Sequence, residues 1–316
     1  MKICVLGAGS LGCAIGGTLA KAGADVTLIN RRPEYVDAIN RNGLTLRDAG
    51  GEQRVRVLAA TSAAGLGVMD LIIVLVKSFD TLAAMQGAMC LVGEHTVVLS
   101  LQNGLGHEAV LADLVGAERV LAGKTYVGGL LVTPGVVVAG TQGKETLIGE
   151  LSSHTPDRAN AIAELFNAAG LVTTVCTDIR ATIWDKLLIN VATGALSGIT
   201  GLPYGALYQV PEVRACALAA VAEAMAVARA SGIQLSIQEP HEAWDKAAAG
   251  LPFEFKASML QSLEKGSITE VDYINGAVVE RGAALGVPTP VNATLVACIK
   301  GIEHGLKSHP QRKEAA

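Results

Sequence analysis

The sequence predicts an α/β protein in which a doubly wound, mostly parallel sheet precedes an all-helical domain. Three observations support this fold class. An apolar strand at 2–6 runs directly into a glycine loop, strand and helix patterns alternate as far as about residue 177, and helical periodicity dominates from there on. We therefore expect a first domain over 1–177, a second over 178–306, and a polar, frayed tail at 307–316.

The N-terminal loop has the glycine spacing of a dinucleotide site. Gly7 would allow the tight turn, Gly9 would let the backbone approach a pyrophosphate, and Gly12 would let the next helix pack on the strand. A helix over 11–22, whose N-terminal N–H groups favour phosphate, and a strand over 25–30 complete a strand–helix–strand unit. We predict a Rossmann-type cofactor site. Its loop contacts are expected from Gly7, Ala8, Gly9, Ser10, Leu11 and Gly12.

Length, charge and composition exclude several classes of protein. A chain of 316 residues can form two domains with sizeable cores, and its net charge of -4 offers no basic surface for nucleic acid. No apolar run approaches the ~20 residues of a membrane-spanning helix, and the glycine loop interrupts the apolar stretch that a secretory signal needs. The six cysteines lack metal-ligand spacing, so we expect reduced, mostly buried thiols, no bound metal and a cytoplasmic protein.

The first domain alternates short strands and helices, as in a parallel sheet covered on both faces. Ligands bind such sheets at the carboxyl ends of the strands, so we expect the helical domain to close over that edge and to carry the substrate. Buried strands are expected at 71–76 and 97–101, shorter ones at 44–47, 54–58 and 172–175, and runs at 120–123, 126–132, 136–138 and 146–148 are expected to extend the sheet. Helices are expected at 34–42, 81–91, 107–115, 157–169, 179–191, 213–231, 240–248, 253–264, 271–285 and 293–303.

The end of the second strand indicates which dinucleotide binds. An NAD site places Asp or Glu there to accept hydrogen bonds from the ribose 2′-OH, but this strand ends in Asn30, Arg31 and Arg32. Because a guanidinium suits a 2′-phosphate, we predict NADPH/NADP+ as the cofactor, with Arg31 as a contact. In the alternative interpretation, the two arginines merely solvate a turn.

Two further polar residues follow buried strands. Lys77 comes after the strand at 71–76 and Asn103 after the strand at 97–101. Each could be an ordinary loop residue. We interpret both as cofactor contacts because the strand ends share one edge with the glycine loop.

The helical half carries the candidates for chemistry. Lys186 and Asn190 lie four residues apart on one helix face, and Glu270 stands at a helix start. In the simplest alternative, Lys186 pairs with Asp185 or Asp178 and Glu270 only favours the helix N-terminus.

Five stretches taken together resemble the ketopantoate reductase (2-dehydropantoate 2-reductase) family: KICVLGAGSLG, VKSFD, QNGLG, IRATIWDKLLIN and SITEVDYINGAVVERGAALGVPTP. They span nearly the whole chain in the family's order. The resemblance implies an N-terminal Rossmann domain, a helical C-terminal domain, and NADPH-dependent reduction of 2-dehydropantoate to pantoate in pantothenate and coenzyme A biosynthesis. It also implies that Arg31 binds the cofactor phosphate.

The resemblance gives the candidate residues specific roles. Lys186 would be the catalytic lysine, which protonates the alkoxide as hydride reaches the C2 carbonyl. Glu270 would be the active-site glutamate, able to balance the lysine and to contact the cofactor, and Asn103 would lie near the nicotinamide. Substrate contacts are implied for Lys186, Asn103, Asn190 and Ser258.

Three positions depart from the family pattern. Gly194 stands one turn beyond Asn190, where the family often carries an asparagine, Tyr204 replaces an asparagine of some members, and residues 124–126 replace a threonine run. Since losing a hydrogen-bond partner alters discrimination, a different 2-keto acid is the first alternative substrate. A non-catalytic NADP(H)-binding sensor is the second alternative. The alanine-rich stretch at 215–230 is compatible with packing within the chain or in a homodimer.

Overall fold

The computed structural model describes residues 1–48, 50–151 and 156–308. The chain divides into two compact units, one formed by 1–102 with 106–179 and the other by 103–105 with the residues from 180 onward. The short segment 103–105 therefore belongs by its contacts to the second unit. Of the predicted tail, residues 309–316 lie outside the described residues.

The main sheet of the first unit has the strand order β12-β11-β8-β7-β6-β1-β2-β5. Six neighbouring strands, β8, β7, β6, β1, β2 and β5, run parallel to one another, and β11 pairs antiparallel with β8. The predicted α/β class with a mostly parallel sheet is therefore confirmed. The strands are β1 (Lys2–Leu6), β2 (Asp25–Ile29), β5 (Leu58–Ala60), β6 (Leu71–Val74), β7 (Val97–Ser100), β8 (Val120–Thr125), β11 (Thr146–Glu150) and β12 (Thr173–Val175).

Four strands form a second sheet, in the order β4-β3-β10-β9. The prediction that the runs at 126–132 and 136–138 extend the main sheet is therefore wrong. The predicted strand at 54–58 is also wrong, because its two ends belong to different sheets. Periodicity identifies an extended run but not its partner strand. The strands of this sheet are β3 (Leu44–Asp48), β4 (Gly51–Val55), β9 (Gly128–Thr133) and β10 (Val136–Gly140).

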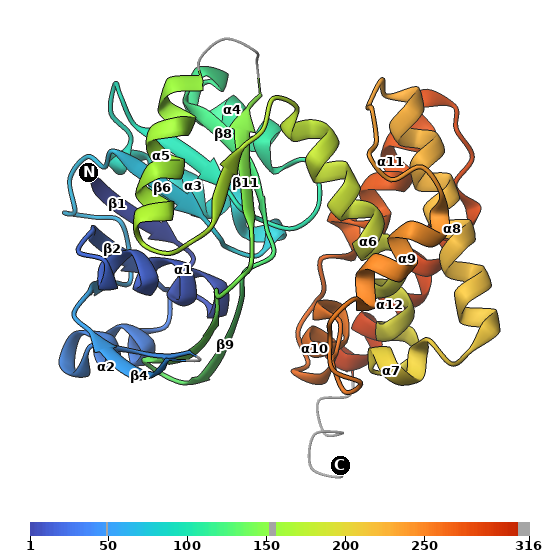
Figure 1. Cartoon of the computed structure of the whole chain (residues 1–316), viewed down its shortest axis with the longest axis horizontal. Helices are drawn as coiled ribbons and strands as arrows, with labels where there is room; N and C mark the ends of the chain where they lie inside the picture. The colour runs from blue at the N-terminus through green and yellow to red at the C-terminus, as the bar shows by residue number, and fades with distance from the viewer. Residues whose placement is uncertain (49, 152–155, 309–316) are drawn as a thin grey trace. The chain divides into compact units, whose positions relative to one another are not determined.

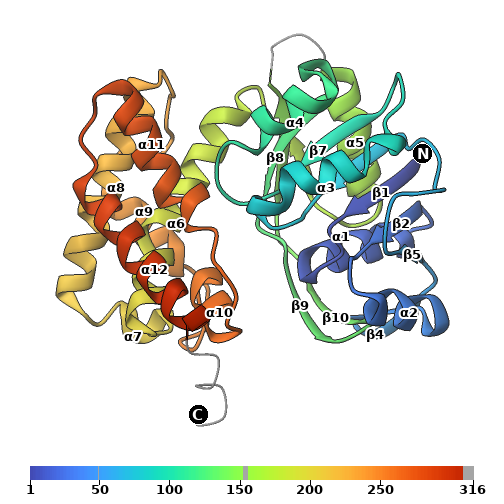
Figure 2. The ribbon, with the colours of Figure 1, turned by 180° about the vertical axis from the view of Figure 1, so that it is seen from behind.

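The helices of the first unit cover both faces of the main sheet. Ile3 and Val5 of β1 join the core that contains residues of α1 (Ser10–Lys21) and α5 (Pro156–Ala168). Cys4 and Leu6 point the other way, toward α3 (Thr81–Gly87) and α4 (His107–Val115). Figure 1 shows α1 and α5 on one face, and Figure 2 shows α3 and α4 on the other. The predicted helix at 81–91 ends at Gly87 and is followed by a 3-10 turn, η2 (Met89–Leu91).

The second unit is helical, as predicted. The predicted helix at 253–264 begins only at Ser258, because the carbonyls of Phe253 and Phe255 accept hydrogen bonds from the N–H groups of Gly205 and Tyr204. The predicted helix at 271–285 is interrupted at Ile274. The elements of the second unit are α6 (Ile179–Thr200), α7 (Tyr204–Leu207), α8 (Pro211–Ala230), α9 (Pro240–Ala248), α10 (Ser258–Glu264), η4 (Val271–Tyr273), α11 (Asn275–Leu285) and α12 (Pro290–Ser308).

One face of α8 packs alanines inside the second unit. Ala217, Ala220, Ala224 and Ala228 are fully buried in its apolar core. This face of α8 therefore packs within the chain, whereas Ala215, Ala219, Ala222 and Ala226 of the same helix are exposed.

All six cysteines are free thiols, but the prediction that most are buried is wrong. Cys4 and Cys13 are buried, and burial raises the pKa of each thiol to about 12. The other four sit on half-buried or exposed positions, at 90, 176, 216 and 298. An apolar sequence context does not reveal which side of a helix meets solvent. In the described part of the chain, no helix combines the length and apolarity needed to cross a membrane.

Candidate active site

The glycine loop joins β1 to α1 with very little free space at two of its three glycines. Gly7 has φ +107°, and a Cβ there would lie 2.4 Å from the backbone N of Val76. A Cβ on Gly12 would lie 2.3 Å from the carbonyl oxygen of Gly7. A Cβ on Gly9 would meet no protein atom within 4 Å, so open space lies beside Gly9 and the N-terminus of α1. This arrangement fits a pyrophosphate.

The second sheet lies against the first turn of α1. A Cβ on Gly129 of β9 would lie 2.3 Å from the carbonyl oxygen of Ser10, and the N–H of Leu131 donates to Ser10 Oγ at 3.2 Å. The close approach of the two backbones requires glycine at 129. The hydroxyl of Ser10, a predicted cofactor contact, is thus engaged with β9.

The turn after β2 (Asp25–Ile29) carries Asn30, Arg31 and Arg32, which the sequence predicts to lie near the adenosine ribose of the cofactor. Asn30 donates through Nδ2 to the carbonyl of Ala8 at 2.7 Å and accepts from the N–H of Arg32 at 3.0 Å. Its side chain therefore ties this turn to the glycine loop. Arg31 is largely exposed and forms an ion pair with Asp80, while the Arg32 guanidinium lies over the ring of Tyr35.

The loop after β6 (Leu71–Val74) is fixed by a buried amide. Lys77 is exposed and immediately precedes a 3-10 turn, η1 (Ser78–Asp80). Gln102 donates through Nε2 to the carbonyl of Val76 at 2.9 Å and to Thr81 Oγ1 at 2.8 Å. This glutamine therefore holds the chain on either side of Lys77. We did not single out Gln102 from the sequence, although it lies in the QNGLG stretch.

In the second unit, Lys186 contacts a predicted site residue. Its Nζ donates to Oδ1 of Asn103 at 2.7 Å, and both side chains are partly buried. The carboxylate of Asp185 instead accepts the backbone N–H groups of Ser236 and Ile237, at 3.0 and 3.3 Å. Asp185 is thus engaged with the backbone of the segment that follows α8.

The Glu270 segment is held next to Asn103. The N–H of Leu105 donates to the carbonyl of Tyr273 at 2.9 Å. Gly104 has φ +99°, and a Cβ there would lie 2.5 Å from the same carbonyl oxygen. Glu270 itself is 8% exposed and immediately precedes η4. Lys186, Asn103 and the Glu270 turn therefore belong to one connected group.

A buried carboxylate holds the other end of the Glu270 turn. Oε1 of Glu303, on α12, accepts the N–H of Thr269 at 2.6 Å and its hydroxyl at 2.8 Å. Lys300 lies 3.5 Å from Glu303 and also pairs with Asp272. Sequence patterns could not identify Glu303, because a glutamate near a helix C-terminus has no local signature.

The start of α10 packs against α6 one turn beyond Asn190. Ser258 begins α10 with an exposed position, and the next residue, Met259, is buried. A Cβ on Gly194 would lie 3.3 Å from Cε and 3.5 Å from Sδ of Met259. The space that an asparagine would take is therefore occupied by a thioether. Asn190 is half-buried and shares the face of Lys186 through its four-residue spacing.

Tyr204 also meets α6 near this point. Its hydroxyl lies 2.9 Å from Thr193 Oγ1, its ring packs edge-on against Phe255, and burial raises its pKa. This tyrosine is thus committed to packing between α6 and the segment that leads to Ser258.

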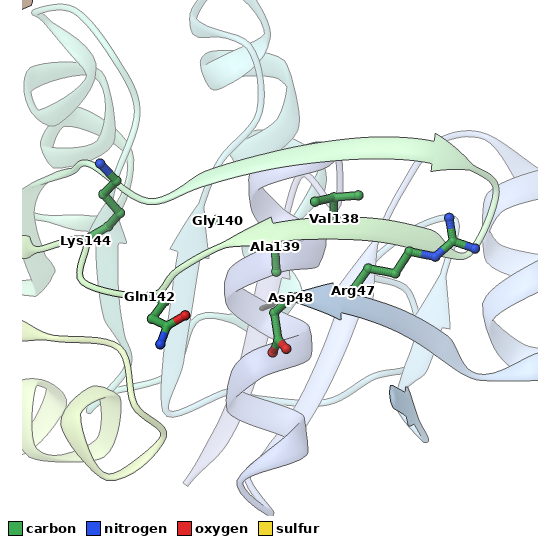
Figure 3. A pocket seen from close by; sticks show the side chains of 7 residues that line it. All are labelled: Arg47, Asp48, Val138, Ala139, Gly140, Gln142 and Lys144. Atoms are coloured by element: carbon green, nitrogen blue, oxygen red, sulfur yellow. The ribbon is translucent and has the colours of Figure 1, made fainter. Parts of the chain in front are cut away.

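A hollow of about 310 Å³ lies in the first unit, along β3, β10 and the loop that follows. Figure 3 shows that its two cationic side chains, Arg47 and Lys144, point away from each other. None of its lining residues is a predicted site residue, so we assign it no part in the site. The residues that line the hollow are Arg47, Asp48, Val138, Ala139, Gly140, Gln142 and Lys144.

The glycine-loop cradle of the first unit defines a dinucleotide-binding protein. Comparison with known proteins identifies the family. The sequence-family model described as ketopantoate reductase PanE/ApbA matches residues 3–153. The family model of the C-terminal part of ketopantoate reductase PanE/ApbA matches residues 178–303. The chain therefore belongs to the ketopantoate reductase family, as the sequence resemblance predicted.

Three relatives illustrate the similarity. The chain is 36% identical to a 2-dehydropantoate 2-reductase of Halobacterium salinarum, over 95% of this chain and 98% of the relative. It is 37% identical to the solved PanE/ApbA family ketopantoate reductase of Ralstonia eutropha, with TM-score 0.88 over 97% of this chain and all (100%) of the other. It is 27% identical to a D-mandelate dehydrogenase solved with NADH and anilino(oxo)acetate, with TM-score 0.92 and coverage of 97% and 100%.

Proposed function

We propose that this chain uses NADPH to reduce 2-dehydropantoate to pantoate, in pantothenate and coenzyme A biosynthesis, with Lys186 as the proton donor. The observation that carries the proposal is the 2.7 Å contact between Lys186 Nζ and Asn103 Oδ1, next to the Glu270 turn. The names of the curated relatives also support this substrate.

The residues of the second unit match the needs of carbonyl reduction. When bound, the reduced nicotinamide supplies a hydride to the C2 carbon of the substrate. As the C=O π bond breaks, the Lys186 ammonium stabilises the negative charge on oxygen and gives it a proton. Asn103 accepts from the ammonium without neutralising it, and Glu270 balances its charge. Asn190 and Ser258 bind the hydroxyl and carboxylate groups of the substrate.

In the first unit, Gly7–Gly12 would hold the pyrophosphate, and Arg31 and Lys77 would supply positive charge. The choice of NADPH over NADH rests on the turn after β2, where Asn30 replaces the carboxylate of an NAD site and Arg31 follows.

A second candidate is reduction of a bulkier 2-keto acid by the same mechanism. The contact of Met259 with Gly194 favours it, because a thioether and a missing amide give an apolar wall beside Asn190. The high structural similarity to D-mandelate dehydrogenase, which was solved with NADH and anilino(oxo)acetate, supports the same candidate.

Steady-state kinetics test both candidates. We would follow oxidation of NADPH and, in parallel, of NADH, with 2-dehydropantoate, 2-oxoisovalerate and phenylglyoxylate as substrates. The highest kcat/KM with 2-dehydropantoate and NADPH would support the first proposal, and a higher value with phenylglyoxylate would support the second. Folded, NADPH-binding protein without turnover on any of these substrates would contradict both and favour a sensor.

Two variants assign the role of Lys186. Lys186→Ala is expected to remove most of the rate while NADPH still binds, as measured by quenching of protein fluorescence. Lys246→Ala, at an exposed lysine paired with Glu242 on α9, is the matched control and should keep the rate.

We further propose a cytoplasmic location, because all six cysteines, each within the described residues, are free thiols. A homodimer also stays a proposal. Light scattering of the purified chain tests it.

A further inference from the structure

We propose that Asp80 limits how strongly this protein prefers NADPH over NADH, because its carboxylate competes with the cofactor 2′-phosphate for Arg31. The inference rests on the proposed cofactor site.

The ion pair has the geometry of a guanidinium bound to a phosphate. Nη2 of Arg31 lies 2.7 Å from Oδ2 of Asp80, and Nη1 lies 3.4 Å from Oδ1. Two nitrogens of the guanidinium thus face two carboxylate oxygens. A 2′-phosphate that approached these two nitrogens would have to share them with the Asp80 carboxylate.

Asp80 is directed at Arg31 and not at its own helix. It occupies the N-cap position of α3, where an aspartate usually accepts a backbone N–H of the first turn. Its side chain makes no such capping hydrogen bond. The side chain of Asp80 is 24% exposed and that of Arg31 is 80% exposed. The carboxylate is therefore the better fixed partner, and the guanidinium is free to change its orientation.

The pair also lies where an adenosine ribose binds in this class of fold. Arg31 follows β2, and Asp80 follows β6, and these two strands flank β1 and its glycine loop. Asn30, at the usual position of the ribose-binding carboxylate, uses both ends of its amide on Ala8 and Arg32. Asp80 is thus placed to accept the 2′-OH of NADH, whereas NADPH must first separate Arg31 from it.

Binding of nucleotide fragments tests this without turnover. We would titrate the full chain with 2′,5′-ADP and with 5′-ADP in a calorimeter, at low and high salt. Asp80→Asn is expected to bind 2′,5′-ADP roughly fivefold more tightly, which is about the value of one exposed ion pair. Its affinity for 5′-ADP should stay unchanged or fall slightly. The gain with 2′,5′-ADP should shrink at high salt, because salt screens exposed charges.

A matched control removes the same charge nearby. Asp37→Asn breaks the exposed Asp37–Arg41 pair on α2 (Pro33–Asn42), whose atoms lie 3.2 Å apart. It should leave both affinities unchanged. If Asp80→Asn leaves 2′,5′-ADP binding unchanged or weakens it, or if Asp37→Asn strengthens it equally, the inference is wrong.

Arg31→Ala separates this inference from the cofactor proposal. A large loss of 2′,5′-ADP affinity, without a matching loss for 5′-ADP, is expected if Arg31 binds the phosphate. If this variant changes neither affinity, the proposed NADPH site itself fails. If Arg31→Ala behaves as expected and Asp80→Asn does not, only the role of Asp80 fails.

Discussion

Lys186 and Asn103 are 83 residues apart in sequence, yet Nζ of Lys186 donates to Oδ1 of Asn103 at 2.7 Å. Asn103 is a neutral amide, so this contact by itself orients the ammonium without adding a negative charge beside it. A cation in this state can both attract an anionic 2-keto acid and stabilise the developing alkoxide.

The amide character of residue 103 gives a first prediction. Asn103→Asp places a carboxylate against the ammonium, which makes Lys186 a poorer acid and repels the substrate carboxylate. We expect kcat/KM to fall by ~10-fold or more, and the pH dependence of kcat to shift upward. In Asn103→Ala, kcat/KM should fall less, because this change removes the orienting contact without adding a charge. The measurement is a pH–rate profile of each variant. Equal losses of kcat/KM in the two variants would contradict this role of the amide.

The contact between Gly104 and Tyr273 gives a second prediction. Gly104→Ala forces a Cβ to within 2.5 Å of the Tyr273 carbonyl and should displace Asn103 from the Glu270 turn. We expect a loss of stability of roughly 1–3 kcal/mol together with a lower kcat. Gly106 has nearly the same φ, +98°, but a Cβ there meets no atom within 4 Å. Gly106→Ala is therefore the control for backbone strain, and chemical denaturation with kinetics of both variants should separate them.

Glu303 gives a third prediction, as a positioning residue for Glu270. Glu303→Gln keeps the shape but weakens the two hydrogen bonds from Thr269, which are 2.6 and 2.8 Å long. We expect kcat to fall several-fold with KM nearly unchanged, and stability to fall by about 1–3 kcal/mol. Glu264→Gln, at an exposed glutamate paired with Lys256, should change neither quantity.

The measurement must be made well below the unfolding temperature, so that lost stability alone does not lower the rate. A Glu303→Gln enzyme that is less stable but has the kcat of the unchanged protein would show that Glu303 supports only the fold.

The sequence was most informative where the determinants are local. The helices at 107–115 and 240–248 have the predicted bounds, and the glycine loop lies between the predicted strand and helix. What could not be predicted depends on contacts between distant segments. The second sheet needs the approach of Gly129 to Ser10, which are far apart in the chain. Pairing of Asp80 with Arg31 likewise has no local signature.

Gly194 gives the last prediction, because its contact with Met259 links a missing amide to a specific apolar neighbour. Gly194→Asn alone should have a lower kcat/KM for both substrates, since even a Cβ at this position would lie 3.3 Å from the thioether of Met259. Met259→Ala opens space beside Asn190 and should raise kcat/KM for phenylglyoxylate relative to 2-dehydropantoate. The double variant has room for the amide, so it should favour the hydroxyl-bearing 2-dehydropantoate most strongly. The two changes are therefore expected to be non-additive, because the residues are in contact.

A double-mutant cycle on the two substrates measures this coupling. Met225→Ala, at a buried methionine of α8, is the control for loss of a core methionine and should leave the substrate ratio unchanged. If the ratio is the same in all four members of the cycle, Gly194 and Met259 do not contribute to substrate choice. A shift of the ratio toward 2-dehydropantoate only in the double variant would instead show that the thioether, and not the glycine alone, keeps the amide out.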